Sequence, residues 1–119
     1  MEGRVRVIYK ICRTADWRAA EESGTFEGAA VDLADGYIHF STAAQVAETA
    51  ARHFSGADDL VLVAVDEAQL GSALRFEVSR GGDLFPHLYG PLPVSAVHWV
   101  LPLALGADGR HVWPDIHLL

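Results

Sequence analysis

The fold is decided by the stretch Asp35–Thr42, which reads Asp-Gly-Tyr-Ile-His-Phe-Ser-Thr. In an extended segment, alternation places the isoleucine and phenylalanine on one side and the tyrosine, histidine and serine on the other. The apolar side is predicted to face a core. Thr42 with Gln45 three residues later matches a capping box, which predicts that a helix begins at Thr42. The stretch therefore predicts a short strand that runs directly into a helix.

Outward from this stretch, the spacing of apolar residues predicts the other elements. Residues 60–65 form a continuous apolar run, which is typical of a strand buried on both faces. Residues 24–35 show no sustained period and are predicted to form a loop. The predicted strands lie at residues 4–11, 37–40, 60–65, 74–78, 94–103 and 111–113, and the predicted helices at 14–23 and 42 to about 54. The sequence thus predicts an α+β fold: a mixed, mainly antiparallel split sheet of about six strands, with two helices in the N-terminal half.

Length and charge limit the classes of function. A chain of 119 residues supports one domain, expected to span residues 1–119, and no apolar run approaches the roughly 20 residues of a membrane span. The N-terminus lacks the features of a signal peptide, and a single cysteine, Cys12, excludes an internal disulfide. We therefore expect a cytoplasmic protein. The net charge of −7 argues against general binding to nucleic acid but leaves room for a small anionic ligand.

A second informative run, Gly81–Pro93, reads Gly-Gly-Asp-Leu-Phe-Pro-His-Leu-Tyr-Gly-Pro-Leu-Pro. It contains too many glycines and prolines for a helix or a central strand. If it is extended, His87 and Tyr89 share a face and offer an acid–base group and a stacking ring. The Gly81-Gly82 pair allows close approach to a ligand, and Arg80 supplies a fork suited to phosphate or carboxylate. The alternative is a rigid crossover whose aromatic rings only fill the core.

The two runs together predict one pocket. His39 and His87 are its candidate catalytic residues. Ser41 and Thr42 would lie at a helix N-terminus, where free N–H groups favour an anion; the alternative is that they only cap the helix. The candidate ligand-binding residues are Tyr37, Ser41, Thr42, Arg80, Gly81, Gly82 and Tyr89. The histidine spacing matches no metal-binding motif, so no metal site is predicted.

Over nearly its whole length the chain resembles the bacterial family called domain of unknown function 952. The resemblance is carried by Tyr9-Lys10-Ile11, Trp17, the stretch Asp35–Thr42, the strand that begins at Asp59, and the run from Ser79 to Leu92. This family implies no particular activity.

At the level of the fold, the strand that ends in His-Phe-Ser and enters a helix resembles the NAD-using ADP-ribosyltransferase superfamily, especially its RNA 2′-phosphotransferase branch. The resemblance implies that His39 and Ser41 lie in an NAD cleft and that Tyr9 and Lys10 border it. Where many such enzymes have His or Arg on the first strand, this chain has Lys10. Glu77 is the nearest candidate for the catalytic glutamate of that superfamily.

These observations leave three hypotheses. The first is a nucleotide or NAD-like anion pocket in an ADP-ribosyl- or phospho-transferase-like enzyme, with NAD as the candidate cofactor. The second is a non-catalytic module that binds a small anionic metabolite. The third is a protein-interaction domain, which would expose the aromatic residues of Phe85–Tyr89 to a partner.

Overall fold

Two antiparallel sheets that meet along one edge form the frame of the protein. The computed structural model describes residues 6–115, apart from the side chain of Arg80. Its helices are α1 Thr14–Ser23, α2 Ala30–Asp35 and α3 Val46–His53. Its strands are β1 Val7–Arg13, β2 Thr25–Phe26, β3 Ile38–His39, β4 Leu60–Asp66, β5 Leu74–Val78, β6 Leu84–Leu88, β7 Leu92–Pro93, β8 Val97–Leu105 and β9 His111–Val112.

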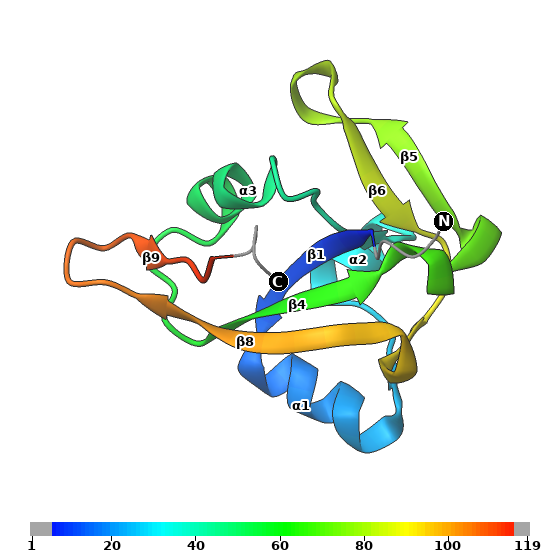
Figure 1. The fold of residues 1–119 in the computed structure, drawn as a ribbon, viewed down its shortest axis with the longest axis horizontal. Helices are drawn as coiled ribbons and strands as arrows, with labels where there is room; N and C mark the ends of the chain where they lie inside the picture. The colour runs from blue at the N-terminus through cyan, green and yellow to red at the C-terminus, as the bar shows by residue number, and fades with distance from the viewer. Residues whose placement is uncertain (1–5, 116–119) are drawn as a thin grey trace.

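The larger sheet has the strand order β1-β4-β8-β9. The apolar strand β4 lies between β1 and β8 and is buried on both faces, as its continuous hydrophobic run predicts. One face packs against α1 through Trp17, and the other packs against α3 through Val46 and Ala50. The two helices therefore cover opposite faces of this sheet (Figure 1).

The smaller sheet has the order β3-β6-β5, and within residues 6–115 one isolated bridge joins it to the larger sheet. The amide of Tyr9 in β1 donates to the carbonyl of Ser41, and the amide of Ser41 donates back to Tyr9, both at 2.8 Å. The sheets diverge away from this bridge, so a space opens between β1 and the β3–β6 pair. A further pair, β2 with β7, packs beside α1.

The predicted fold class is confirmed: the protein is α+β, all strand pairs of the described residues are antiparallel, and the helices lie in the N-terminal half. The predicted loop at residues 24–35 is wrong, because this segment contains β2 and α2. Both are too short, at two and six residues, to show a period in the sequence. Residues 4 and 5 of the first predicted strand lie outside the described residues.

The second of the two predicted helices, α3 in the structure, begins at Val46 rather than at Thr42. The carbonyl of Thr42 accepts from the amides of Gln45 and Val46, so these residues form a turn ahead of the helix. The side chain of Gln45 still accepts from the amide of Thr42 at 3.1 Å, which is half of the predicted capping box.

The expectation that the Pro-rich run avoids a central strand is also wrong, because β6 lies between β3 and β5. Pro86 fits there because only its carbonyl is used on the β3 side, where it accepts from the amide of Phe40 at 3.0 Å. The strand β3 pairs with β6 over only two residues, so the ladder ends where the missing N–H of Pro86 would be needed. Within residues 6–115, no helix is long and apolar enough to cross a membrane.

Candidate functional site

A cavity of about 720 Å³ occupies the space between the two sheets. Side chains from β1, β3, β6 and α3 line it, so residues far apart in the sequence face one another. Six of the residues predicted from the sequence line this cavity: Tyr9, Lys10, Tyr37, His39, Ser41 and His87. The bridge between the sheets places β1 beside the Asp35–Thr42 stretch, and the β3–β6 ladder sets His39 directly opposite His87.

The buried carboxylate of Asp32 connects Lys10 to His39. Asp32 is 1% exposed. Its two oxygens accept from the ammonium of Lys10 at 3.0 and 2.9 Å, from Nδ1 of His39 at 2.6 Å and from the amide of His39 at 3.0 Å. The amide of Ala29 donates to the same carboxylate at 2.8 Å. A buried carboxylate surrounded by donors in this way fixes both Lys10 and His39 in place.

Burial by itself raises the pKa of Asp32, but the hydrogen bond from His39 and then the charge and hydrogen bond of Lys10 outweigh it. The pKa of Asp32 is therefore held at about 2. The carboxylate is ionised throughout the neutral range and is a permanent acceptor for both neighbours.

His39 contacts a carboxylate at each ring nitrogen. Nδ1 lies 2.6 Å from Asp32, and Nε2 lies 2.9 Å from Asp35. An ionised carboxylate accepts hydrogen bonds but has no proton to donate. A neutral imidazole has one N–H and satisfies one of these contacts, whereas an imidazolium, with two, satisfies both.

His87 is held differently. Its Nδ1 lies 2.8 Å from Glu77, whose same oxygen accepts from the hydroxyl of Tyr89 at 2.8 Å. The hydrogen bond from His87, followed by that from Tyr89, lowers the pKa of Glu77. Nε2 of His87 has no hydrogen-bond partner among the described groups, which exclude the side chain of Arg80, and His87 lines the cavity. With Nδ1 as the donor to Glu77, Nε2 has a lone pair available to a ligand.

The ring of Tyr37 joins the two histidines. It stacks on His87 at 4.1 Å between ring centroids and lies 4.6 Å from His39, and the two imidazoles are 5.7 Å apart. Burial, followed by the charges of Asp35 and Glu77, raises the pKa of Tyr37, so its hydroxyl stays protonated at neutral pH. The aromatic contacts hold the imidazoles at a distance that one small ligand group can bridge.

The hydroxyl of Ser41, which is 3% exposed, continues the polar wall of the cavity. It lies 2.9 Å from the hydroxyl of Thr49, which donates to the carbonyl of Gln45 at 3.2 Å. Since the proton of Thr49 is used in that bond, Ser41 is the donor to Thr49. The side chain of Ser41 is thereby oriented from α3.

The other predicted site residues do not line the cavity. The amide of Thr42 is already bonded to Gln45, so the anion site expected at that helix start is not formed there. Gly81 and Gly82 form the tip of the β5–β6 hairpin with φ of 70° and 85°. The ring centroids of Tyr89 and Tyr37 are 5.3 Å apart, and the hydroxyl of Tyr89 donates to Glu77. The side chain of Arg80 lies outside the described residues.

Sequence reasoning missed Asp32 and Asp35, since both fell in or beside a segment predicted to be a loop. One signal could have found Asp32. Lys10 lies on the same side of β1 as Ile8 and Cys12, which predicts a buried cation, and a buried cation needs a carboxylate partner. Asp35 stands four residues before His39, but no helix spans that spacing, and only the turn at Gly36 brings the two together.

Cys12 does not supply a nucleophile to this site. It is 2% exposed, and burial raises the pKa of its thiol to about 12. The reactive thiolate is therefore absent at neutral pH.

Gly28 is expected to be required for the position of Asp32. Its φ is 123°, and a Cβ there would lie 2.9 Å from the Cβ of Asp32. Gly28→Ala should therefore lower the free energy of unfolding by about 1–3 kcal/mol more than Gly56→Ala, because it adds a clash with a buried side chain. Gly56 is the matched control, with a φ of 78° and no atom within 4 Å of the added Cβ. Urea unfolding measures both variants, and equal losses would contradict this assignment.

Asp32 is also expected to set part of the acid sensitivity of the fold. Because its pKa in the folded state is lowered to about 2, its contribution is complete above the ordinary carboxyl range and is lost as the pH falls from about 4 to about 2. The contribution is roughly 2 kcal/mol. The free energy of unfolding of Asp32→Asn should therefore be lower than that of the natural chain. It should also depend less on pH in this window. Parallel curves for Asp32→Asn and the natural chain would refute the prediction.

Comparison with known proteins places the chain. The family model described as "Protein of unknown function (DUF952)" matches residues 11–100. The crystal structure of protein CC0527 from Caulobacter crescentus is 52% identical, with a TM-score of 0.89 over 95% of this chain and 99% of that one. The solution structure of CC0527 is 55% identical, with a TM-score of 0.79 over 87% of this chain and 90% of that one. No curated protein matches. The chain therefore belongs to the DUF952 family.

Proposed function

We propose that the protein is an acid–base enzyme for a nucleotide-like ligand, with His39 and His87 as its catalytic residues. One observation carries the proposal. The two imidazoles lie in one cavity with ring centroids 5.7 Å apart, and each is held through Nδ1 by its own carboxylate. Paired, oriented histidines of this kind are typical of general acid–base catalysis.

The two histidines differ in the way that such a reaction requires. His87 has a free Nε2 that would accept a proton from an attacking hydroxyl or water. In this proposal His39 is the general acid and would donate from Nε2 to a leaving-group oxygen, whereas nicotinamide leaves NAD as a neutral molecule and needs no proton. Asp35, which occupies Nε2 of His39, is 46% exposed, so a ligand oxygen can displace it without opening the core.

The shape and lining of the cavity support a ligand of nucleotide size. Its volume of about 720 Å³ lies within the range of about 300–1,000 Å³ for small-molecule sites. Tyr37 offers an aromatic wall for a planar group. The ammonium of Lys10 has three N–H groups and a single carboxylate partner, so a donor remains for a phosphate or carbonyl oxygen. The resemblance to NAD-using transferases makes NAD the first ligand to test.

Thermal-shift and calorimetric titrations with NAD, ADP-ribose, adenosine phosphates and sugar phosphates test the binding. We expect at least one of these to raise the melting temperature of the natural protein. The shift should be reduced in His39→Gln and His87→Gln. His98→Gln, at an exposed position on β8, is the matched control and should keep the shift. If none of the compounds stabilises the natural protein, the nucleotide-like ligand is wrong.

Binding without chemistry is the second candidate, and Glu77 favours it. This carboxylate, the nearest match to a transferase glutamate, is occupied with His87 and Tyr89. Incubation of NAD with the protein separates the two candidates. Release of nicotinamide, followed by chromatography and lost in His87→Gln, supports transfer or hydrolysis, and stable binding with no release supports a binding module.

The interaction-domain hypothesis required an exposed aromatic run at Phe85–Tyr89. That requirement is not met, because Phe85 and Leu88 are 7% and 2% exposed and only Tyr89 reaches the surface. These side chains form a wall of the cavity and part of the core instead.

A further inference from the structure

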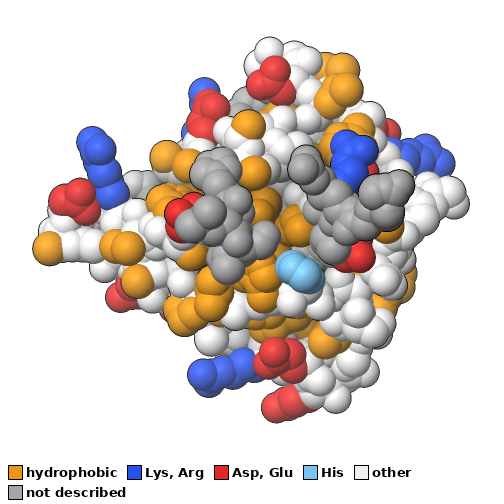
Figure 2. Space-filling model, in the orientation of Figure 1, with side chains coloured by type: hydrophobic (Ala, Val, Ile, Leu, Met, Phe, Trp, Pro, Cys, Tyr) orange, Lys and Arg blue, Asp and Glu red, His pale blue; other side chains and the backbone are white. Residues whose placement is uncertain are grey.

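The outer strand of the smaller sheet, β5, presents hydrophobic side chains to solvent. Phe76 is 41% exposed, Val78 70% and Leu84 53%. Val78 pairs with Leu84 across the hairpin, and Phe76 precedes Val78 by two residues, so the three share one face. The hairpin projects from the body of the molecule (Figure 1), and hydrophobic side chains reach the surface at its outer end (Figure 2). No element formed by residues 6–115 covers this apolar face.

The backbone of β5 is also open on its outer side. Pro86 directs its carbonyl to Phe40 on the β3 side, so the residues next to Pro86 direct their backbone groups toward β5. Their partners in β5 are Arg75 and Glu77. Phe76, between them, therefore directs its N–H and C=O outward. No strand of the described residues pairs with this edge, and an open edge is a template for another strand.

We propose that β5 pairs antiparallel with β5 of a second copy, about a two-fold axis at Phe76. This register sets Phe76 opposite its own counterpart, with the outward N–H and C=O groups exchanged. It also sets Arg75 of each copy opposite Glu77 of the other. These positions form non-hydrogen-bonded pairs, in which side chains approach most closely, so opposite charges meet twice.

The charges also select this register. An axis moved by one residue toward the N-terminus would set Arg75 against the Arg75 of the second copy. An axis moved by one residue the other way would set Glu77 against Glu77. Both alternatives leave the backbone pairing possible but oppose like charges at the two-fold axis. Of these three registers, only the one about Phe76 sets opposite charges against each other.

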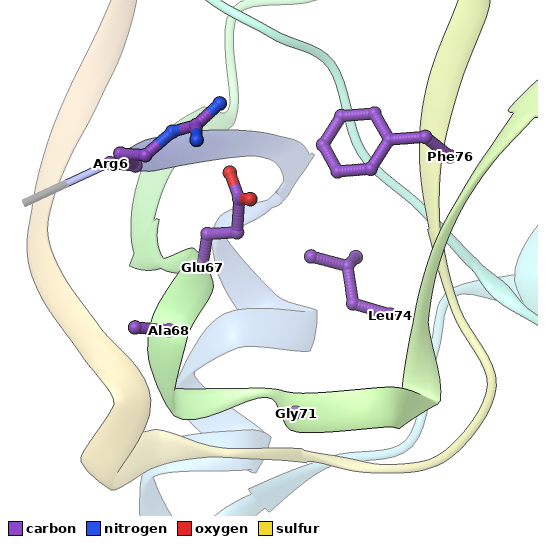
Figure 3. Close-up of a pocket in the computed structure, with 6 residues that line it drawn as sticks. All are labelled: Arg6, Glu67, Ala68, Gly71, Leu74 and Phe76. Carbon is purple, nitrogen blue, oxygen red and sulfur yellow. The ribbon is translucent and has the colours of Figure 1, made fainter.

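A hollow beside β5 gives room for the second copy. It has a volume of about 380 Å³ and is lined by Leu74 and Phe76 of β5 and, across from them, by Glu67 and Arg6. Figure 3 shows the side chains of Leu74 and Phe76 extending from the strand into this space. The phenyl ring of Phe76 from the second copy, beside its counterpart, would cover the hollow with apolar surface.

The opposite face of β5 presents Arg75 and Glu77, which contact residues of the candidate site. Glu77 holds His87, and Arg75 lies 5.1 Å from the ring of Tyr89. In the proposed dimer, Arg75 of the second copy stands across from Glu77. Each copy would thereby add a cation beside the carboxylate that orients the other copy's His87.

Sedimentation equilibrium of the full chain tests the dimer. We expect twice the mass of one chain at micromolar concentration and the mass of one chain for Phe76→Lys, with circular dichroism confirming that the variant is folded. Leu33→Lys replaces an exposed leucine of α2, 66% exposed, and should remain dimeric. Arg75→Glu should weaken association about tenfold, and adding Glu77→Arg should restore it. A natural chain that stays monomeric at all concentrations overturns the proposal.

Single cysteines test the register. In a Cys12→Ala background, Phe76→Cys should form a disulfide between two chains in oxidised glutathione, because the two positions face each other. Val78→Cys is the control: it is more exposed, yet lies about 13 Å from its counterpart in this register. Linkage at position 78 in preference to position 76 would show that the strands do not pair as proposed.

Discussion

The Asp32→Ala variant is expected to lose about 3–5 kcal/mol of folding free energy. The substitution leaves the ammonium of Lys10, 5% exposed, without its carboxylate partner. It also removes the acceptor of the amides of Ala29 and His39. An unpaired buried charge and two unpaired amides account for the size of the effect. Chemical unfolding followed by circular dichroism measures it.

The matched control is Asp35→Ala, which removes the other carboxylate of His39 from a half-exposed position. A loss of less than about 1 kcal/mol is expected there, since solvent screens the interaction. Lys10→Met combined with Asp32→Ala should be more stable than Asp32→Ala alone, because no charge is then left buried. Similar losses in the two single aspartate variants would show that Asp32 does not have the role assigned to it.

His87→Gln is expected to lower turnover of the proposed substrate by about 10²–10⁴-fold. Glutamine keeps a polar side chain of similar size but has no basic nitrogen to accept the proton. If His87 acts in the chemical step, kcat falls while the affinity for the ligand changes little. The measurement is release of nicotinamide under saturating NAD, with affinity determined separately by calorimetry.

Glu77→Gln separates orientation from proton transfer. The amide oxygen can still accept from Nδ1 of His87, but the negative charge is lost, so an intermediate loss of turnover is expected. His98→Gln should turn over substrate at the natural rate. If His87→Gln retained full turnover, the histidine would be part of the cavity wall only, and the binding module would be the better description.

The long strands were readable from the sequence because their patterns extend over several residues. The apolar run of β4 and the alternation of β5 each predict a strand at the correct place. The strands β2 and β3 are two residues long and have no period of their own. Only the aromatic and polar residues around His39 marked β3, and nothing comparable marked β2.

Only part of the centre of the site could be predicted from the sequence. His39 and His87 stand out because each lies in an unusual run of aromatic and turn-forming residues. Asp32 does not stand out, because it lies in a one-and-a-half-turn helix that local sequence does not predict. Its importance comes from tertiary contacts with Lys10 and His39, 22 and 7 residues away in the chain.

The prediction that the Pro-rich run avoids a central strand was wrong, since β6 lies between β3 and β5. Proline is excluded from central strands because it lacks an N–H, but the exclusion applies only where a partner requires that group. The pairing partner β3 ends at His39, so Pro86 occupies a position at which only its carbonyl is needed. This placement is what brings His87 opposite His39.

The most direct test of the two-histidine site is an NMR measurement of the imidazole nitrogens, with and without NAD. In the free protein, Nδ1 of His39 and Nδ1 of His87 should each show the signal of an N–H hydrogen-bonded to its carboxylate, Asp32 or Glu77. Addition of NAD should shift the ring signals of His39 and His87 and leave those of His98 unchanged. NAD-induced shifts confined to residues outside the cavity would contradict the two-histidine site.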